Sequence, residues 1–156
     1  MAVWQVDFAI VPKHALAAKP RIPISDLIDA DWWSSEHLPS EYARHLSAIA
    51  PAGSSWTNEL QTWGTEDGNR VEVRFENGKP VRMIARVDVR RLDAKFGAML
   101  LQFARTADAL LLRADGLVVE PLVGAFGAAL RTSAAWQYAT DPATSLRSYS
   151  EPEDDE

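Results

Sequence analysis

Two adjacent β-strands are encoded in residues 70–90, which read RVEVRFENGKPVRMIARVDVR. In residues 70–76 and 81–90 the odd-numbered positions are apolar and most even-numbered positions are charged. Such alternation is typical of strands with one face on a core and one face in water. The stretch therefore predicts an antiparallel hairpin.

The connection of this hairpin follows from parity. A two-residue turn at Asn77-Gly78 would place Arg74 opposite Val81, a charged residue against a core residue. A three-residue loop, Glu76-Asn77-Gly78, keeps the two apolar faces together and puts glycine at the left-handed bulge position. We therefore expect the three-residue loop.

Further strands are indicated on both sides of the hairpin by alternation or by short apolar runs next to turn residues. They are expected at Trp4–Ile10 (ending at Pro12), Thr57–Trp63, Leu110–Leu112 and Leu117–Val119. The last two flank Asp115-Gly116, a hairpin signal, and are apolar throughout, which predicts a central position in the sheet.

Helices are indicated by capping residues and by apolar residues at helical spacing. We expect a short helix from Ser25-Asp26 through Trp33, one after Pro39-Ser40, one after the cap Asp93, and a last one from Pro121 to Asp141-Pro142. Prolines make residues 12–24 a predicted loop.

The predicted order is β–α–β–β–β–α–β–β–α. Strands joined by tight turns are antiparallel, so we expect an α+β protein with an antiparallel sheet of about six strands and helices on one face. At 156 residues the chain predicts a single domain over residues 1–149. Residues 150–156 are acidic and are expected to be disordered and to add little to stability.

Composition excludes several classes of protein. The chain has no cysteine, so disulfides, thiolate metal sites and thiol catalysis are absent. It shows neither an export signal nor a stretch of about 20 apolar residues, which predicts a cytoplasmic protein without a membrane span.

The formal net charge of −6 is unevenly distributed. Residues 1–67 and 151–156 are acidic, whereas residues 68–113 are basic. Overall acidity argues against DNA binding, which needs clustered positive charge, and favours a basic protein partner.

The first candidate site is an acidic segment around two adjacent tryptophans. Adjacent helical residues point about 100° apart, so we expect one of the two to be exposed, unless both belong to a satellite hydrophobic cluster. An exposed aromatic ringed by carboxylates is typical of a hot spot for a basic protein. The predicted partner-binding residues are Asp29, Asp31, Trp32, Trp33 and Glu36.

The second candidate is the charged face of the predicted sheet. An aromatic among arginines could stack nucleic-acid bases, although the interleaved acids favour ordinary cross-strand ion pairs. This alternative binding face comprises Trp63, Arg70, Arg74, Arg82, Arg86 and Arg90.

Signals for catalysis are sparse, and the chain contains none of the common nucleotide-binding, zinc-protease or serine-hydrolase motifs. His37, Glu41 and His45 have helical spacing for a metal, but Pro39 interrupts the helix and a solvated acidic helix pair is the plainer interpretation. His14, His37 and His45 could serve acid–base chemistry or simply lie on the surface. We therefore assign no catalytic residue, no metal ligand and no cofactor.

Residues 63–142 resemble small bacterial α+β immunity proteins of polymorphic-toxin systems. The resemblance rests on Trp63-Gly64, Asp67-Gly68-Asn69, Arg86–Arg90, the Phe96 helix, Asp115-Gly116, the Pro121 helix, Ser133–Trp136 and Asp141-Pro142. It implies a protein that binds and neutralises a cognate toxin without catalysis of its own. The alternatives are a small metal- or histidine-dependent hydrolase or nuclease, and a nucleic-acid-binding module that uses the arginine face.

Overall fold

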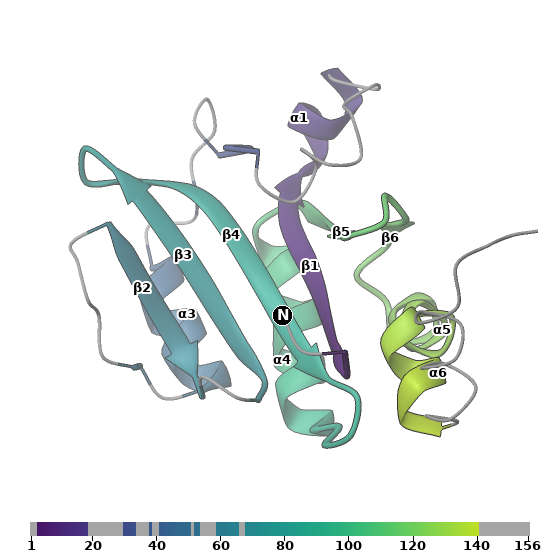
Figure 1. Ribbon diagram of the computed structural model, residues 1–156. Helices are drawn as coiled ribbons and strands as arrows, with labels where there is room; N and C mark the ends of the chain where they lie inside the picture. The colour runs from purple at the N-terminus through teal and green to yellow at the C-terminus, as the bar shows by residue number, and fades with distance from the viewer. Residues whose placement is uncertain are drawn as a thin grey trace, which may run out of the picture.

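The computed structural model describes residues 3–18, 30–33, 38, 41–50, 52–53, 59–65 and 68–140. The strands are β1 (Gln5–Pro12), β2 (Leu60–Gly64), β3 (Arg70–Glu76), β4 (Lys79–Asp88), β5 (Ala109–Arg113) and β6 (Val118–Val119). The helices are α1 (Lys13–Ala18), α3 (Tyr42–Ile49), α4 (Ala94–Thr106), α5 (Val123–Arg131) and α6 (Ala134–Thr140) (Figure 1).

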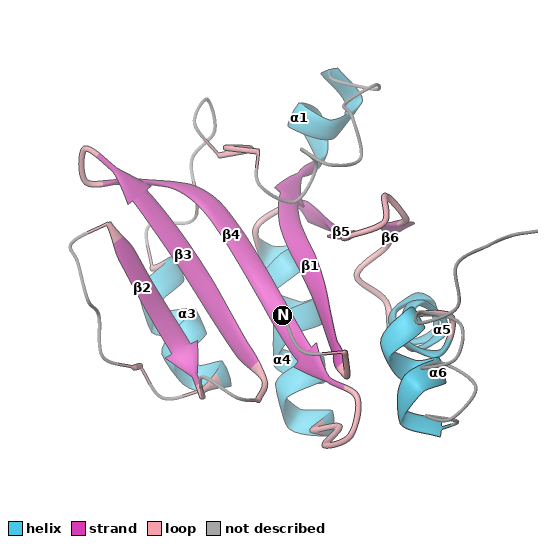
Figure 2. Ribbon diagram, viewed as in Figure 1, coloured by secondary structure: helices cyan, strands magenta, loops and turns pink. Residues whose placement is uncertain are grey.

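The six strands form one antiparallel sheet in the order β2-β3-β4-β1-β5-β6 (Figure 2). The protein therefore has the α+β fold that the pattern predicts. The first strand in sequence, β1, lies between β4 and β5, so the terminal segment becomes a central strand. Of the two apolar strands predicted to be central, β5 is an inner strand between β1 and β6, whereas β6 forms the edge of the sheet and its Val118 is exposed.

The hairpin of β3 and β4 differs from its predicted connection. Asn77 and Gly78 both have positive φ, 52° and 78°, which is the signature of a two-residue type I′ turn. Parity is restored inside the ladder, where Phe75 pairs with Pro80 but Arg74 pairs with Arg82. The extra residue is Val81, so a β-bulge rather than a longer loop keeps both apolar faces on the core.

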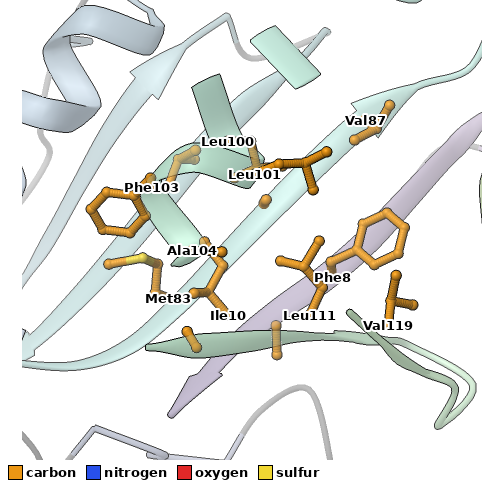
Figure 3. Packing of buried hydrophobic residues seen from close by; sticks show 14 of the residues in the cluster. Phe8, Ile10, Met83, Val87, Leu100, Leu101, Phe103, Ala104, Leu111 and Val119 are labelled. Atoms are coloured by element: carbon orange, nitrogen blue, oxygen red, sulfur yellow. The ribbon is translucent and has the colours of Figure 1, made fainter. Parts of the chain in front are cut away.

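Helices α3 and α4 cover one face of the sheet, behind the strands in the view of Figure 1. Helix α4 begins where predicted, because the side chain of Asp93 accepts hydrogen bonds from the backbone N–H groups of Lys95 and Phe96. Figure 3 shows the core between the layers, where side chains of β1, β4, α4, β5 and β6 meet. Fully buried Phe8, Ile10 and Leu111 lie at its centre.

Two helical segments depart from the expectations. Lys13–Ala18 forms α1 inside a predicted loop, because no proline falls within KHALAA and alanine favours the helix. The predicted last helix divides into α5 and α6 at Ser133, whose hydroxyl oxygen accepts from the backbone N–H of Trp136 and caps a new helix. The predicted helix start at Ser25-Asp26 and residues 150–156 lie outside the described residues.

Candidate functional site

The tryptophan pair of the first candidate site is buried. Trp32 is 4% exposed and Trp33 is 1% exposed, so the expectation that one of them reaches solvent was wrong. That expectation assumed a helix, whereas residues 30–33 form a turn in which adjacent side chains can both enter the core. A binding hot spot of the expected kind needs an exposed indole, so this tryptophan pair does not form a hot spot.

Trp33 has a specific structural role. Its backbone N–H donates to the carbonyl oxygen of Val81 at 2.9 Å, and its indole Nε1 donates to the carbonyl oxygen of Ile10 at 2.8 Å. The pairing of β1 with β4 extends only to Ala9 and Ile84. Trp33 therefore bonds to both strands beyond the end of their ladder, and one of its acceptors is the bulge residue.

The acids around the tryptophans are placed only in part. Asp31 accepts two hydrogen bonds from Arg82 through Oδ1, at 2.9 Å from Nη2 and 3.2 Å from Nε. Asp29 and Glu36 lie outside the described residues. The one acid that is described thus pairs with an arginine of the sheet face, which reduces the charge it offers to a partner.

Four arginines of the second candidate, those within β3 and β4, lie on one side of the sheet. Arg70 pairs with Arg86 in register and Arg74 with Arg82, while Arg90 follows the end of β4. Most of them form ion pairs within the fold, Arg70 with Glu72 at 3.1 Å, Arg86 with Asp7 at 3.0 Å and Arg90 with Asp88 at 3.1 Å. Alternating signs at such distances cancel the field that a nucleic acid would need.

Trp63 does not join this face. It pairs with Val71 in register, is 1% exposed, and its indole N–H donates to the hydroxyl of Ser47 in α3. The expectation that Trp63 lies among the arginines was therefore wrong, because its register places it on the core side. Trp4 instead provides the aromatic contact of this region, with the Arg90 guanidinium 3.7 Å from its ring centre.

The histidine and metal candidates do not converge. Glu41 is paired with Arg44 at 2.7 Å, His45 lies against Phe103, and exposed His14 is 3.8 Å from Asp108. His37 lies outside the described residues. Within the part of the chain that the structure describes, no three His, Asp or Glu side chains could hold a metal ion together.

A groove of about 480 Å³ between α4 and α5 is a feature that the sequence analysis missed. The α4 wall is formed mainly by Ala94, Gly97, Ala98 and Leu101. The α5 wall is formed by Val123, Phe126, Gly127 and Leu130. Leu92 and Val123 line this groove and are 51% and 77% exposed, and Leu122, next in sequence to Val123, is 54% exposed. Leu122 is exposed although it stands four and eight positions before the buried residues Phe126 and Leu130, a spacing typical of one helix face.

Helix α5 is held in place at both ends. Arg105 of α4 donates to the carbonyl oxygen of Pro121 at 2.6 Å, just before α5 begins. Arg113 of β5 donates to the carbonyl oxygen of Ala129 at 2.7 Å, near its end. These contacts fix α5 against α4 and the sheet, so the groove is preformed.

Arg113 is itself held by Asp115. Its Nε and Nη2 donate to the two carboxylate oxygens at 2.8 Å and 2.7 Å, a bidentate pair. The hydrogen bonds from Arg113 hold the pKa of the Asp115 carboxyl below its ordinary value. A charged Asp115 therefore supports the arginine that positions α5.

The sequence contains a weak indication of the groove. Small residues at Gly97, Ala98 and Gly127 stand on helix faces where larger side chains would close the space, and Val123 follows Leu122 at the start of α5. Helical periodicity identifies these faces but does not indicate that they face each other across an open space.

Comparison with protein-family models, curated proteins and solved structures finds no match to this chain. Among the described residues, no helix combines the length and apolar character that crossing a bilayer requires.

Proposed function

We propose that this protein is a non-enzymatic binding protein that neutralises a bacterial toxin by direct contact. The observation that carries the proposal is the preformed groove between α4 and α5, with Leu92, Leu122 and Val123 exposed at or beside it. Contiguous exposed apolar surface bordered by polar residues is typical of a protein-binding site. The resemblance of residues 63–142 to immunity proteins gives the toxin as the partner.

Charge supports a basic toxin. The described residues hold 13 Lys and Arg against 11 Asp and Glu, whereas the remaining residues hold 3 against 11. The acidic excess therefore resides outside the described residues, in segments such as 141–156, with six acids and one arginine, and 66–67, with two acids. Such segments would speed encounter with a basic surface, while the apolar groove supplies affinity. We further propose that this binding takes place in the cytoplasm.

The experiment starts from capture of partners from the native cell with the full-length protein as bait. A captured protein should be toxic when expressed alone, and co-expression of the full chain should restore growth. Ala98→Gln, which fills an exposed position in the groove, should weaken the purified complex at least ~10-fold, about 1.4 kcal/mol.

Ala128→Gln makes the same chemical change at an exposed α5 position outside the groove and should leave binding unchanged. Equal effects of the two variants on affinity would show that the groove is not the binding site. A captured partner whose toxicity the full chain does not relieve would overturn neutralisation as the function.

A further inference from the structure

The two walls of the groove share one geometric pattern. Ala94, Gly97, Ala98 and Leu101 of α4 follow the spacing i, i+3, i+4, i+7. Val123, Phe126, Gly127 and Leu130 of α5 repeat it. Two helices that turn such faces toward a common space present ridges and grooves of the kind that a third helix packs against.

From this geometry, and resting on the proposed function, we propose that the groove receives an amphipathic α-helix of the protein partner, with an apolar stripe flanked by carboxylates. The described part of the protein then supplies two helices of a three-helix packing unit, and the partner supplies the third.

Small residues make close approach of a helix possible. A Cβ at Gly97 would lie 3.5 Å from the Phe126 ring, so α4 and α5 are already in contact at this level of the groove. Ala94 and Ala98, one turn apart, present only methyl groups on the same wall. Apolar side chains of the incoming helix can therefore pack against these methyl groups, with exposed Leu92 and Val123 beside them.

Charge at the groove selects a helix with acidic flanks. The Arg131 guanidinium lies over Gly127, with Nη1 3.1 Å from the position that a Cβ would occupy there. Arg91 and Lys95, next in sequence to lining residues Leu92 and Ala94, are exposed cations. The lining acid Asp93 is engaged by the backbone N–H groups of its own helix, so it opposes them weakly. A carboxylate on the partner helix would find a guanidinium partner in Arg131.

The test uses two helix-stapled 18-residue peptides and the purified full-length protein. Both peptides carry leucine at i, i+3, i+4, i+7 and their repeats; one has glutamate at the flanking positions and the other has lysine there. Fluorescence anisotropy should show that the glutamate peptide binds. The affinity of the lysine peptide should be lower by roughly fivefold or more. Arg131→Gln should reduce this difference.

Matched variants show whether binding uses the groove. Ala98→Gln should lower the affinity for the glutamate peptide at least ~10-fold, whereas Ala128→Gln should leave this affinity unchanged. Equal binding of both peptides, or equal effects of both variants, would overturn the inference. Dodecanoate is tested in parallel, and its saturable binding with no binding of either peptide would identify a small apolar ligand instead.

These experiments distinguish a wrong helical occupant of the groove from a wrong proposed function. If Ala98→Gln weakens the native toxin complex but neither peptide binds, the helical occupant is wrong and neutralisation stands. If the glutamate peptide binds as expected but no toxin is neutralised, the groove still receives a helix and the proposed function is wrong.

Discussion

The indole Nε1 of Trp33 donates a 2.8 Å hydrogen bond to the carbonyl oxygen of Ile10, just beyond the last paired residues of β1 and β4. The carbonyl belongs to a fully buried residue of the central strand. A buried acceptor without a partner is costly, so this contact makes the turn at residues 30–33 part of the sheet's stability.

Trp33→Phe should therefore destabilise the protein by about 1–3 kcal/mol, because it removes the donor and leaves the Ile10 oxygen buried without it. Urea unfolding followed by far-ultraviolet circular dichroism measures the change. Trp136→Phe is the matched control. It makes the same change at a half-buried tryptophan and leaves the hydrogen bond from Trp33 to Ile10 intact. Equal losses for the two variants would mean that lost packing, not the hydrogen bond, sets the cost.

Gly64 and Gly78 both have positive φ, 114° and 78°, but differ in their surroundings. A Cβ at Gly64 would collide with the backbone oxygen of Asn69, whereas a Cβ at Gly78 would meet nothing within 4 Å. Gly78→Ala should cost about 1–2 kcal/mol, the backbone strain alone. Gly64→Ala should cost clearly more or prevent folding, as measured by thermal unfolding. A smaller cost at Gly64 than at Gly78 would contradict the packing of the β2–β3 turn.

Asp115→Asn tests the support of α5 through its pH dependence. The lowered pKa of Asp115, caused first by hydrogen bonds from Arg113, means that its carboxylate stabilises the fold above the unfolded-state value near 3.8. This contribution is lost as the pH falls through the still lower folded-state pKa. The melting temperature of the Asn variant should thus lie below wild type at pH 7 and approach it near pH 3.

The Asp115 effect is small, because its side chain is 61% exposed and solvent screens the pair. Glu120→Gln, a change at another exposed acid outside this contact, serves as the control. A gap between Asp115→Asn and wild type that stays constant from pH 7 to pH 3 would show that charge on Asp115 is not the cause.

The ion pair of Asp31 and Arg82 should couple the turn at residues 30–33 to the sheet. A double-mutant cycle with Asp31→Asn and Arg82→Ala should give a coupling energy on the order of 1 kcal/mol, which 1 M salt reduces. The more exposed Glu41–Arg44 pair, also within ion-pair distance, is the comparison and should give a value closer to zero. Equal coupling energies would indicate that partial burial adds nothing to the Asp31 pair.

Local patterns predicted the elements of this fold well. Alternation over residues 70–90 placed Val71 and Met83 on the core face, and the cap at Asp93 and the turn at Asp115-Gly116 occur where expected. These features depend on neighbours within a few positions, so the local sequence pattern is sufficient to predict them. The Asn77-Gly78 turn shows the limit of such reasoning, because its two-residue form depended on a bulge at Val81 that no local rule required.

By itself, the amino-acid sequence determined the class of the fold, the faces of β3 and β4 and the side of the sheet on which their arginines lie. Only the tertiary structure decided that β1 enters between β4 and β5, bringing Asp7 to Arg86 across 79 positions. It likewise decided that Trp32, Trp33 and Trp63 are buried and that α4 and α5 leave a groove between them. The physical reason is that periodicity reports which side of an element is apolar, whereas burial depends on which distant elements meet that side.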